Sequence, residues 1–276
     1  PADLAILTLL FLLNLRGVKE SVKVLLPIFM VFFSTHVVLI VYGVLAHFGG
    51  LPQVVHQANA HLGQDVGRLG VWGVALLFLR AYSLGGGTYT GIEAVSNGVQ
   101  ILREPRVATA KRTMIYMAGS LIFTAGGILI LYLLWNASPE PGKTMNAVVL
   151  ERVFSSWTLG GWHVGAWLVI LTLISEGAIL FVAAQTGFID GPRVLSNMAL
   201  DSWFPHKFAN LSERLVTQNG VLLMGLASAV LMVYTRGNVA FLVVLYSINV
   251  FITFFLSQRG MVRHWWQVRG KEAHWE

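Results

Sequence analysis

The sequence contains no cysteine and few charged residues: Asp, Glu, Lys and Arg make up only 12% of its 276 residues. The absence of cysteine excludes a disulfide framework and a thiolate metal site. Soluble domains carry about 25% charged residues, so too few polar side chains remain here to cover a water-facing surface. With 55% hydrophobic residues, the composition indicates an integral membrane protein.

Long apolar stretches divide the sequence, and proline is scarce inside them. A helix needs about 20 apolar residues to cross the hydrocarbon core of a bilayer. Helices buried in a soluble protein show a polar stripe, which residues 112–135 lack. We therefore predict a single all-α transmembrane domain over residues 1–276 with seven crossings. These are residues 3–15 (a short one), 24–47, 71–102, 112–135, 161–188, 215–234 and 238–258.

The polar connections carry most of the basic residues on one side of these predicted helices. Fourteen lysines and arginines lie in the segments that follow residues 15, 102, 188 and 258, against four in the alternate segments. Because cytoplasmic loops are enriched in lysine and arginine, these four segments are expected to be cytoplasmic in a multi-pass plasma-membrane protein. They include a short amphipathic helix at 190–208 and a tail at 259–276. The sequence opens directly in an apolar run, so we expect it to be a segment of a longer protein.

The stretch 71–102 is too long for one straight crossing and contains three consecutive glycines, Gly85, Gly86 and Gly87. Each glycine weakens a helix by about 1 kcal/mol relative to alanine. Unwound backbone is tolerated at membrane depth only where it lines a cavity or is buried in protein, and broken helices form the midplane sites of secondary transporters. We therefore predict an unwound joint that binds a solute or ion. Its expected ligands are backbone groups of residues 85–91 and polar side chains that follow the glycines: Gly85, Gly86, Gly87, Thr88, Thr90 and Gly91.

Other interpretations of the joint fit less well. A packing face of small residues explains Gly126 and Gly127, but not the polar residues that follow Gly87. The segment lacks the lysine and serine or threonine that end a phosphate-binding P-loop, and it lacks the TVGYG order of a potassium-channel filter.

Three charged residues lie deep in apolar segments: Glu93, Glu176 and Arg80. Intramembrane charges usually face a cavity or a partner. Glu93 follows the joint and is the candidate for proton coupling, with a helix N-terminal interaction as the alternative. Glu176 and Arg80 are candidates for an intramembrane pair, and an interhelical hydrogen bond is the alternative for Glu176. The histidines form no ligand cluster in the sequence, and we assign His56 and His61 to a solvated loop.

Three segments resemble the amino acid–polyamine–organocation (APC) superfamily, and within it the KimA-type potassium–proton symporter branch. They are LRAYSLGGGTYTGIEAVSNGVQILREP (79–105), DGPRVLSNMALDSWFPHKF (190–208) and LYSINVFITFFLSQRGMV (245–262). The resemblance implies a LeuT-like five-plus-five inverted-repeat fold, of which this chain would hold helices 4 to 10, with helix 6 broken at the glycines. It also implies that Thr90 and Glu93 lie beside the substrate or coupling ion, and that Tyr246 lines the path. Glycines stand here in place of the more polar joint of some relatives, which weakens the assignment of potassium as the solute.

The expected function is therefore proton-coupled uptake of a small solute, either a potassium ion or an amino acid, by alternating access. A non-transporting membrane scaffold and an ion channel are the alternatives. No nucleophile–base or metal-ligand constellation indicates an enzyme, and no cofactor is expected beyond the proton gradient. Expected partners are the bilayer, the transported solute or cation and a second copy in a homodimer, but not nucleic acid.

Overall fold

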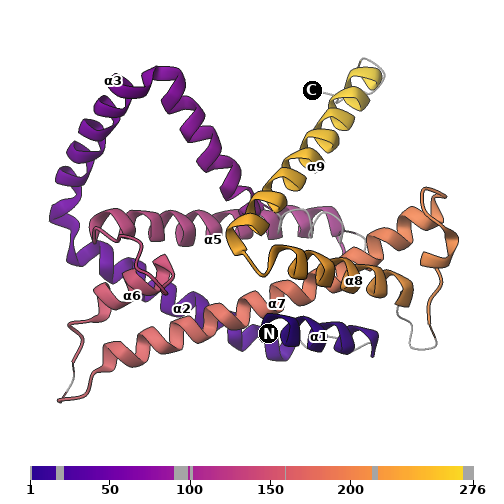
Figure 1. The fold of residues 1–276 in the computed structure, drawn as a ribbon, viewed down its shortest axis with the longest axis horizontal. Helices are drawn as coiled ribbons and strands as arrows, with labels where there is room; N and C mark the ends of the chain where they lie inside the picture. Colours follow the sequence, from indigo (N-terminus) through magenta and orange to yellow (C-terminus); the bar gives the residue numbers. More distant parts are fainter. Residues whose placement is uncertain are drawn as a thin grey trace. The chain divides into compact units, whose positions relative to one another are not determined.

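The computed structural model describes residues 2–16, 22–89, 99, 102–158, 160–212 and 217–269, and within them the regular structure is helical (Figure 1). The α-helices are α1 (Ala2–Leu15), α2 (Val22–Ala46), α3 (Leu51–Leu84), α5 (Arg106–Leu134), α6 (Met145–Phe154), α7 (Val164–Leu200), α8 (Gln218–Thr235) and α9 (Val239–Val268). Short 3-10 helices are η1 (Phe48–Gly50), η2 (Gly85–Tyr89) and η4 (His206–Phe208).

Six of the described helical segments are long and apolar enough to cross a membrane, and α1 is a shorter apolar helix. Large hydrophobic side chains on these helices are exposed, among them Leu76, Ile122 and Leu226. Apolar side chains on the outside of a helix bundle are stable in hydrocarbon and unfavourable in water. The predicted class, an all-α integral membrane protein, is confirmed.

The chain forms two compact units. Unit 1 consists of residues 1–59 and 118–234, and unit 2 consists of residues 60–117 and 235–276. In unit 1, α7 contacts α1, α2 and α6, and its 37 residues make it the longest of the described helices (Figure 1). In unit 2, α9 contacts η2. The candidate glycine joint therefore belongs to unit 2.

The main hydrophobic core of unit 1 is built around α6, a short helix that the sequence analysis did not predict. Val149, Leu150 and Val153 of α6 are completely buried against Leu39 of α2 and Leu131 of α5. Thr144 caps the start of the helix: its side-chain oxygen accepts a hydrogen bond from the backbone N–H of Ala147. Such a cap satisfies one of the unpaired donors at a helix start.

A pair of buried amides joins α1 to α7. The side-chain N–H of Asn14 donates to the Gln185 side-chain oxygen at 2.9 Å, and Gln185 donates back to Asn14 at 3.2 Å. Each amide thus satisfies the other where no water is available, and such pairs hold membrane helices together.

Residues 51–69, which were predicted as a loop, are helical. They form the first part of α3, which kinks at Gly70 with φ 73° and ψ 166°. His56 and His61 are exposed, as predicted, but they lie on this helix. The segment is rich in Ala, Gln and Leu, which favour helices even when the helix is too polar to enter lipid. The apolar part of α3 begins directly after the kink, at the predicted residue 71.

Two predicted helix ends lie inside continuous helices. Helix α7 passes residue 188 and continues to Leu200, so the segment 190–208 is not a separate helix. Pro192 within it is buried, and its ring contacts the backbone of Gly220 in α8, where an added Cβ would lie 2.8 Å from the Pro192 Cβ. Helix α9 likewise continues past residue 258 to Val268.

Candidate functional site

The triple-glycine segment ends the α-helical part of α3. The α-helix stops at Leu84, and residues Gly85–Tyr89 form the 3-10 helix η2. Three glycines in succession oppose the α conformation, since each loses more backbone entropy on ordering than alanine does. A 3-10 helix has poorer hydrogen-bond geometry than an α-helix and often marks a functional hinge. The backbone thus changes its helix type at the residues predicted to form the joint.

Aromatic side chains of α9 lie directly against η2. A Cβ added to Gly86 would lie 2.8 Å from Cε2 of Phe251, and one added to Gly87 would lie 3.0 Å from Cε1 of Tyr246. Gly86 is buried, and the Phe251 ring also contacts Tyr82 of α3, with centroids 5.9 Å apart. Glycine is required here because a side chain at Gly86 would occupy the place of the Phe251 ring. The structure therefore brings Gly86, Gly87 and Tyr246 together.

The remaining predicted ligands differ in how far the structure describes them. Gly85 is exposed, and Thr88 is described only as part of the η2 backbone. Thr90, Gly91 and Glu93 lie outside the described residues, so their binding and coupling roles stay predictions.

Arg80 and Glu176 belong to different units. Arg80 lies on α3 in unit 2, where it is exposed and its backbone carbonyl accepts the Ser83 hydroxyl at 2.8 Å. Glu176 lies on α7 in unit 1 and has other partners there. The pairing of these two residues stays a prediction.

Glu176 is part of a polar cluster in unit 1. Its Oε1 lies 3.2 Å from Nε2 of His36 and accepts a hydrogen bond from the Asn146 side-chain amide at 3.1 Å. The Tyr132 hydroxyl in turn donates to the oxygen of Asn146. The four side chains come from α2, α5, α6 and α7. The interhelical hydrogen bond that was the alternative interpretation of Glu176 is present.

A second polar network fixes the connection between α5 and α6. Arg152 of α6 donates to the carbonyl oxygens of Trp135 and Asn136 at the end of α5. Lys143 contacts Glu151 at 2.5 Å and Glu140 at 3.6 Å. The hydrogen bond to Glu151 raises the pKa of the Lys143 ammonium above its ordinary value, because it stabilises the charged form. Both ends of α6 are therefore tied to the bundle.

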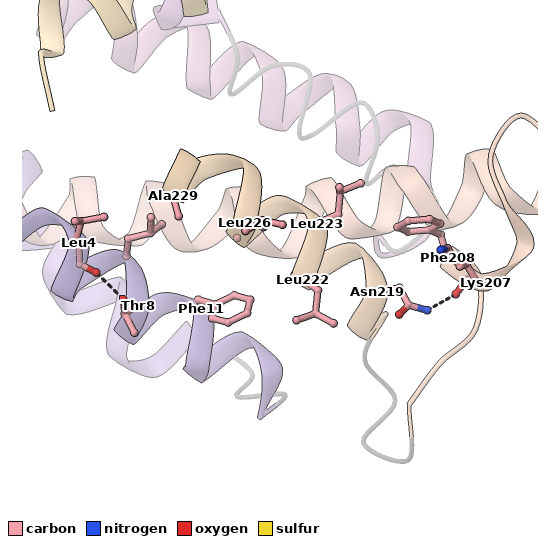
Figure 2. A pocket seen from close by; sticks show the side chains of 12 residues that line it. Leu4, Thr8, Phe11, Lys207, Phe208, Asn219, Leu222, Leu223, Leu226 and Ala229 are labelled. Carbon is pink, nitrogen blue, oxygen red and sulfur yellow. Dashed lines mark hydrogen bonds between the residues drawn. The ribbon is translucent and has the colours of Figure 1, made fainter. Parts of the chain in front are cut away.

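A separate cavity of about 500 Å³ lies between α1, α8 and η4. Figure 2 shows the apolar side chains of α1 and α8 that line it, among them Phe11 and Leu222, with Lys207 and Asn219 at one end. The Asn219 amide donates to the Lys207 carbonyl at 2.7 Å (Figure 2). The cavity contains none of the predicted site residues, and its walls offer few polar groups to orient a ligand.

The sequence analysis missed Phe251 at the joint and His36 in the polar cluster. Phe251 is one of many aromatic residues in an apolar helix, so nothing in the pattern distinguished it. His36 lies inside α2 with its side chain 1% exposed. A lone histidine in the middle of an apolar stretch is a signal of a buried partner.

Comparison with known proteins gives the chain a family. The model of the amino acid permease family matches residues 4–276. The chain is 31% identical over 276 residues to a protein named potassium transporter KimA, from Bacillus subtilis (strain 168), and spans 43% of that protein's length. Because the family match covers nearly every residue, the chain belongs to the amino acid permease family of the APC superfamily, and its fold is part of that family's LeuT-like five-plus-five architecture.

Proposed function

We propose that the protein containing this chain is a secondary active transporter that takes up a small cation, with potassium as the first candidate, by proton-coupled alternating access. The observation that carries the proposal is the conversion of α3 into the 3-10 helix η2 at the triple glycine, inside an apolar membrane segment. Discontinuous helices form the substrate and ion sites of secondary transporters, where unwound carbonyls coordinate cations. Family membership and the similarity to a potassium transporter support the same function.

In this proposal the backbone of residues 85–91 and the hydroxyls of Thr88 and Thr90 bind the cation, while the Tyr246 ring flanks the turn. Carbonyl and hydroxyl oxygens replace the hydration shell of a monovalent cation. Glu93 carries the proton, since a carboxyl group in an apolar segment can exchange between its neutral and charged forms during a transport cycle.

The test uses the full-length protein reconstituted in vesicles. Potassium uptake should follow an imposed proton gradient, and a panel of amino acids should not compete. Competition by an amino acid would instead assign that class of substrate. Turnover far above transporter rates in electrical recordings would identify a channel.

The coupling role of Glu93 has its own test. Glu93→Gln should abolish the pH dependence of uptake, because the amide cannot exchange a proton. The matched control is Glu104→Gln. Glu104 is an exposed carboxylate that pairs with Arg106 at 2.9 Å, so this variant should behave as the wild type. Unchanged pH dependence in Glu93→Gln would assign the coupling to another group.

A further inference from the structure

The polar cluster of unit 1 contains a histidine and a glutamate that the proposed transport site does not use. The His36 side chain is 1% exposed and the Glu176 side chain 17% exposed, and their nearest atoms, Nε2 and Oε1, are 3.2 Å apart. Two groups that can each gain or lose a proton are therefore in contact inside the apolar part of the bundle.

The hydrogen bonds of His36 determine how many protons the pair must hold. Nδ1 lies 2.8 Å from the backbone carbonyl oxygen of Phe32, and Nε2 faces Oε1 of Glu176. A carbonyl oxygen only accepts, so Nδ1 must carry a hydrogen. If the ring is neutral, Nε2 presents a lone pair to Oε1, and the contact then requires a proton on Glu176. If Glu176 is charged, the contact requires a proton on Nε2.

The other contacts of Glu176 supply no substitute for that proton. Asn146 donates to Oε1 through its amide N–H, and its own oxygen accepts the Tyr132 hydroxyl. These donors are already directed, and their hydrogens cannot lie between Nε2 and Oε1. Without a shared proton, a carboxylate oxygen and an imidazole lone pair would face each other in a site of low dielectric, where repulsion is weakly screened.

From this geometry we propose that His36 and Glu176 form a proton-binding site, separate from Glu93, that fastens α6 to α7. With the proton bound, the pair is neutral overall, either as imidazolium with carboxylate or as imidazole with carboxylic acid. When the proton leaves, the pair carries one negative charge, and the hydrogen bond between Nε2 and Oε1 is lost.

The charged and titratable groups around the pair do not offset that charge. On α6, Arg152 and Glu151 are engaged with the end of α5 and with Lys143. Tyr132 is the titratable group of α5 whose hydroxyl reaches the cluster. His47, directly after the end of α2, is exposed, and its ring lies tilted against that of Trp135 with centroids 3.9 Å apart. Within the part of unit 1 that the structure describes, the hydrogen-bond partners of Glu176 are His36 and Asn146.

Proton loss has a mechanical consequence because Asn146 lies in the first turn of α6. The link from Asn146 to Glu176 holds that turn against α7, while the rest of α6 packs in the hydrophobic core. The charged carboxylate loses its hydrogen bond to His36, and its charge is relieved by turning toward water, which also withdraws Oε1 from the Asn146 amide. The first turn of α6 should therefore open when the pair loses its proton. In the proposed transporter, this site would couple proton binding to the connection between α5 and α7.

The experiment uses the full-length protein in lipid nanodiscs and needs no transport. Hydrogen exchange of residues 145–154, corrected for the intrinsic effect of pH, is measured between about pH 5 and about pH 9. The ring nitrogens of 15N-labelled histidine are followed over the same range by NMR. As the pH is raised, hydrogen exchange at the start of α6 should increase by about tenfold or more. The increase should fall in the same pH interval in which the NMR signal of His36 reports proton loss.

Two substitutions should remove the pH step, and one should not. His36→Gln and Glu176→Gln leave no pair to share a proton, so exchange in α6 should no longer respond to pH. His47→Gln, directly after the end of α2, is the control and should keep the wild-type step. If the His36→Gln protein does not fold, the His36 NMR signal can be identified as the one that changes in Glu176→Gln, since that imidazole loses its acidic partner.

Several outcomes would overturn the proposal. They are a His36–Glu176 pair with no shared proton across the range, a His36 titration without a change in α6, a step that survives His36→Gln, and a step abolished by His47→Gln. Failure of potassium uptake would refute the proposed substrate and leave these measurements unaffected, so the two proposals fail separately.

Discussion

At the scale of single residues, Gly86 is the one of the three consecutive glycines where an added side chain has least room. A Cβ added to Gly86 would lie 2.8 Å from Cε2 at the edge of the Phe251 ring. An aromatic ring cannot yield by rotating one terminal atom as a long flexible side chain can. The close approach between η2 and α9 therefore depends on glycine at this position.

Gly86→Ala should reduce uptake by the full-length protein, because the added methyl group displaces η2 from Phe251. Overpacking costs about 1–3 kcal/mol, so we expect uptake to fall by about tenfold or more at unchanged membrane expression. Gly260→Ala is the control, since nothing lies within 4 Å of its added Cβ. Phe251→Leu should partly restore uptake in the Gly86→Ala background. Normal uptake by Gly86→Ala alone would show that this contact does not matter for transport.

At the scale of elements, hydrophobicity predicts that helices exist better than it predicts where they end. The crossings at 24–47 and 215–234 correspond to α2 and α8, because their apolar runs are bounded by polar residues on both sides. The ends predicted at residues 188 and 258 lie inside α7 and α9, since a helix leaves the membrane without losing its backbone hydrogen bonds. Asp190, Gly191 and Pro192 look like a helix end, but packing against Gly220 of α8 accommodates them.

The site shows the same division between local and long-range information. The change of helix type at Gly85 follows from local backbone preference and could be predicted. The contact of Gly86 with Phe251, and that of His36 with Glu176, join residues more than 100 positions apart, and no periodicity in one sequence encodes such pairs. The family resemblance implies that Tyr246 lines the path, and its close approach to Gly87 comes from the structure alone.

The packing of α2 against α5 gives an element-scale prediction with a close internal control. A Cβ on Gly127 would lie 2.6 Å from Cγ2 of Ile40, whereas one on Gly126 would meet nothing within 4 Å. Cγ2 is attached to a branched Cβ, so it cannot move without a change of rotamer or a shift of the helix. Gly127→Ala should lower the free energy of unfolding by about 1–3 kcal/mol, measured as a lower Tm of the purified protein. Gly126→Ala should leave the Tm unchanged or raise it slightly. Equal effects at both positions would contradict this packing.

At the scale of the whole molecule, the chain spans less than half the length of the relative described above. Its described residues include the first part of the proposed transport site, the triple glycine with its α9 contacts, together with the polar cluster of unit 1. The family resemblance implies a central site built from two broken helices facing each other, of which the one at the triple glycine lies in this chain. The transport activity must therefore be measured on the full-length protein, and so must the orientation of the chain in the membrane.

The bias of basic residues predicts that the connection between α5 and α7 faces outward and that the connection between α7 and α8 faces the cytoplasm. Because this chain contains no cysteine, single cysteines can report the orientation once any cysteines elsewhere in the full-length protein are removed. Ser156 and Asn210 are exposed residues in these two connections. In intact cells a membrane-impermeant maleimide should label Ser156→Cys, and it should label Asn210→Cys only after permeabilisation.

The reverse labelling would show that the chain has the opposite orientation. The proton site at His36 and Glu176, which contacts α6, would then exchange its proton with the cytoplasm. Labelling of both positions in intact cells would mean that the segment between them does not cross the membrane, which would contradict α7 as a spanning helix.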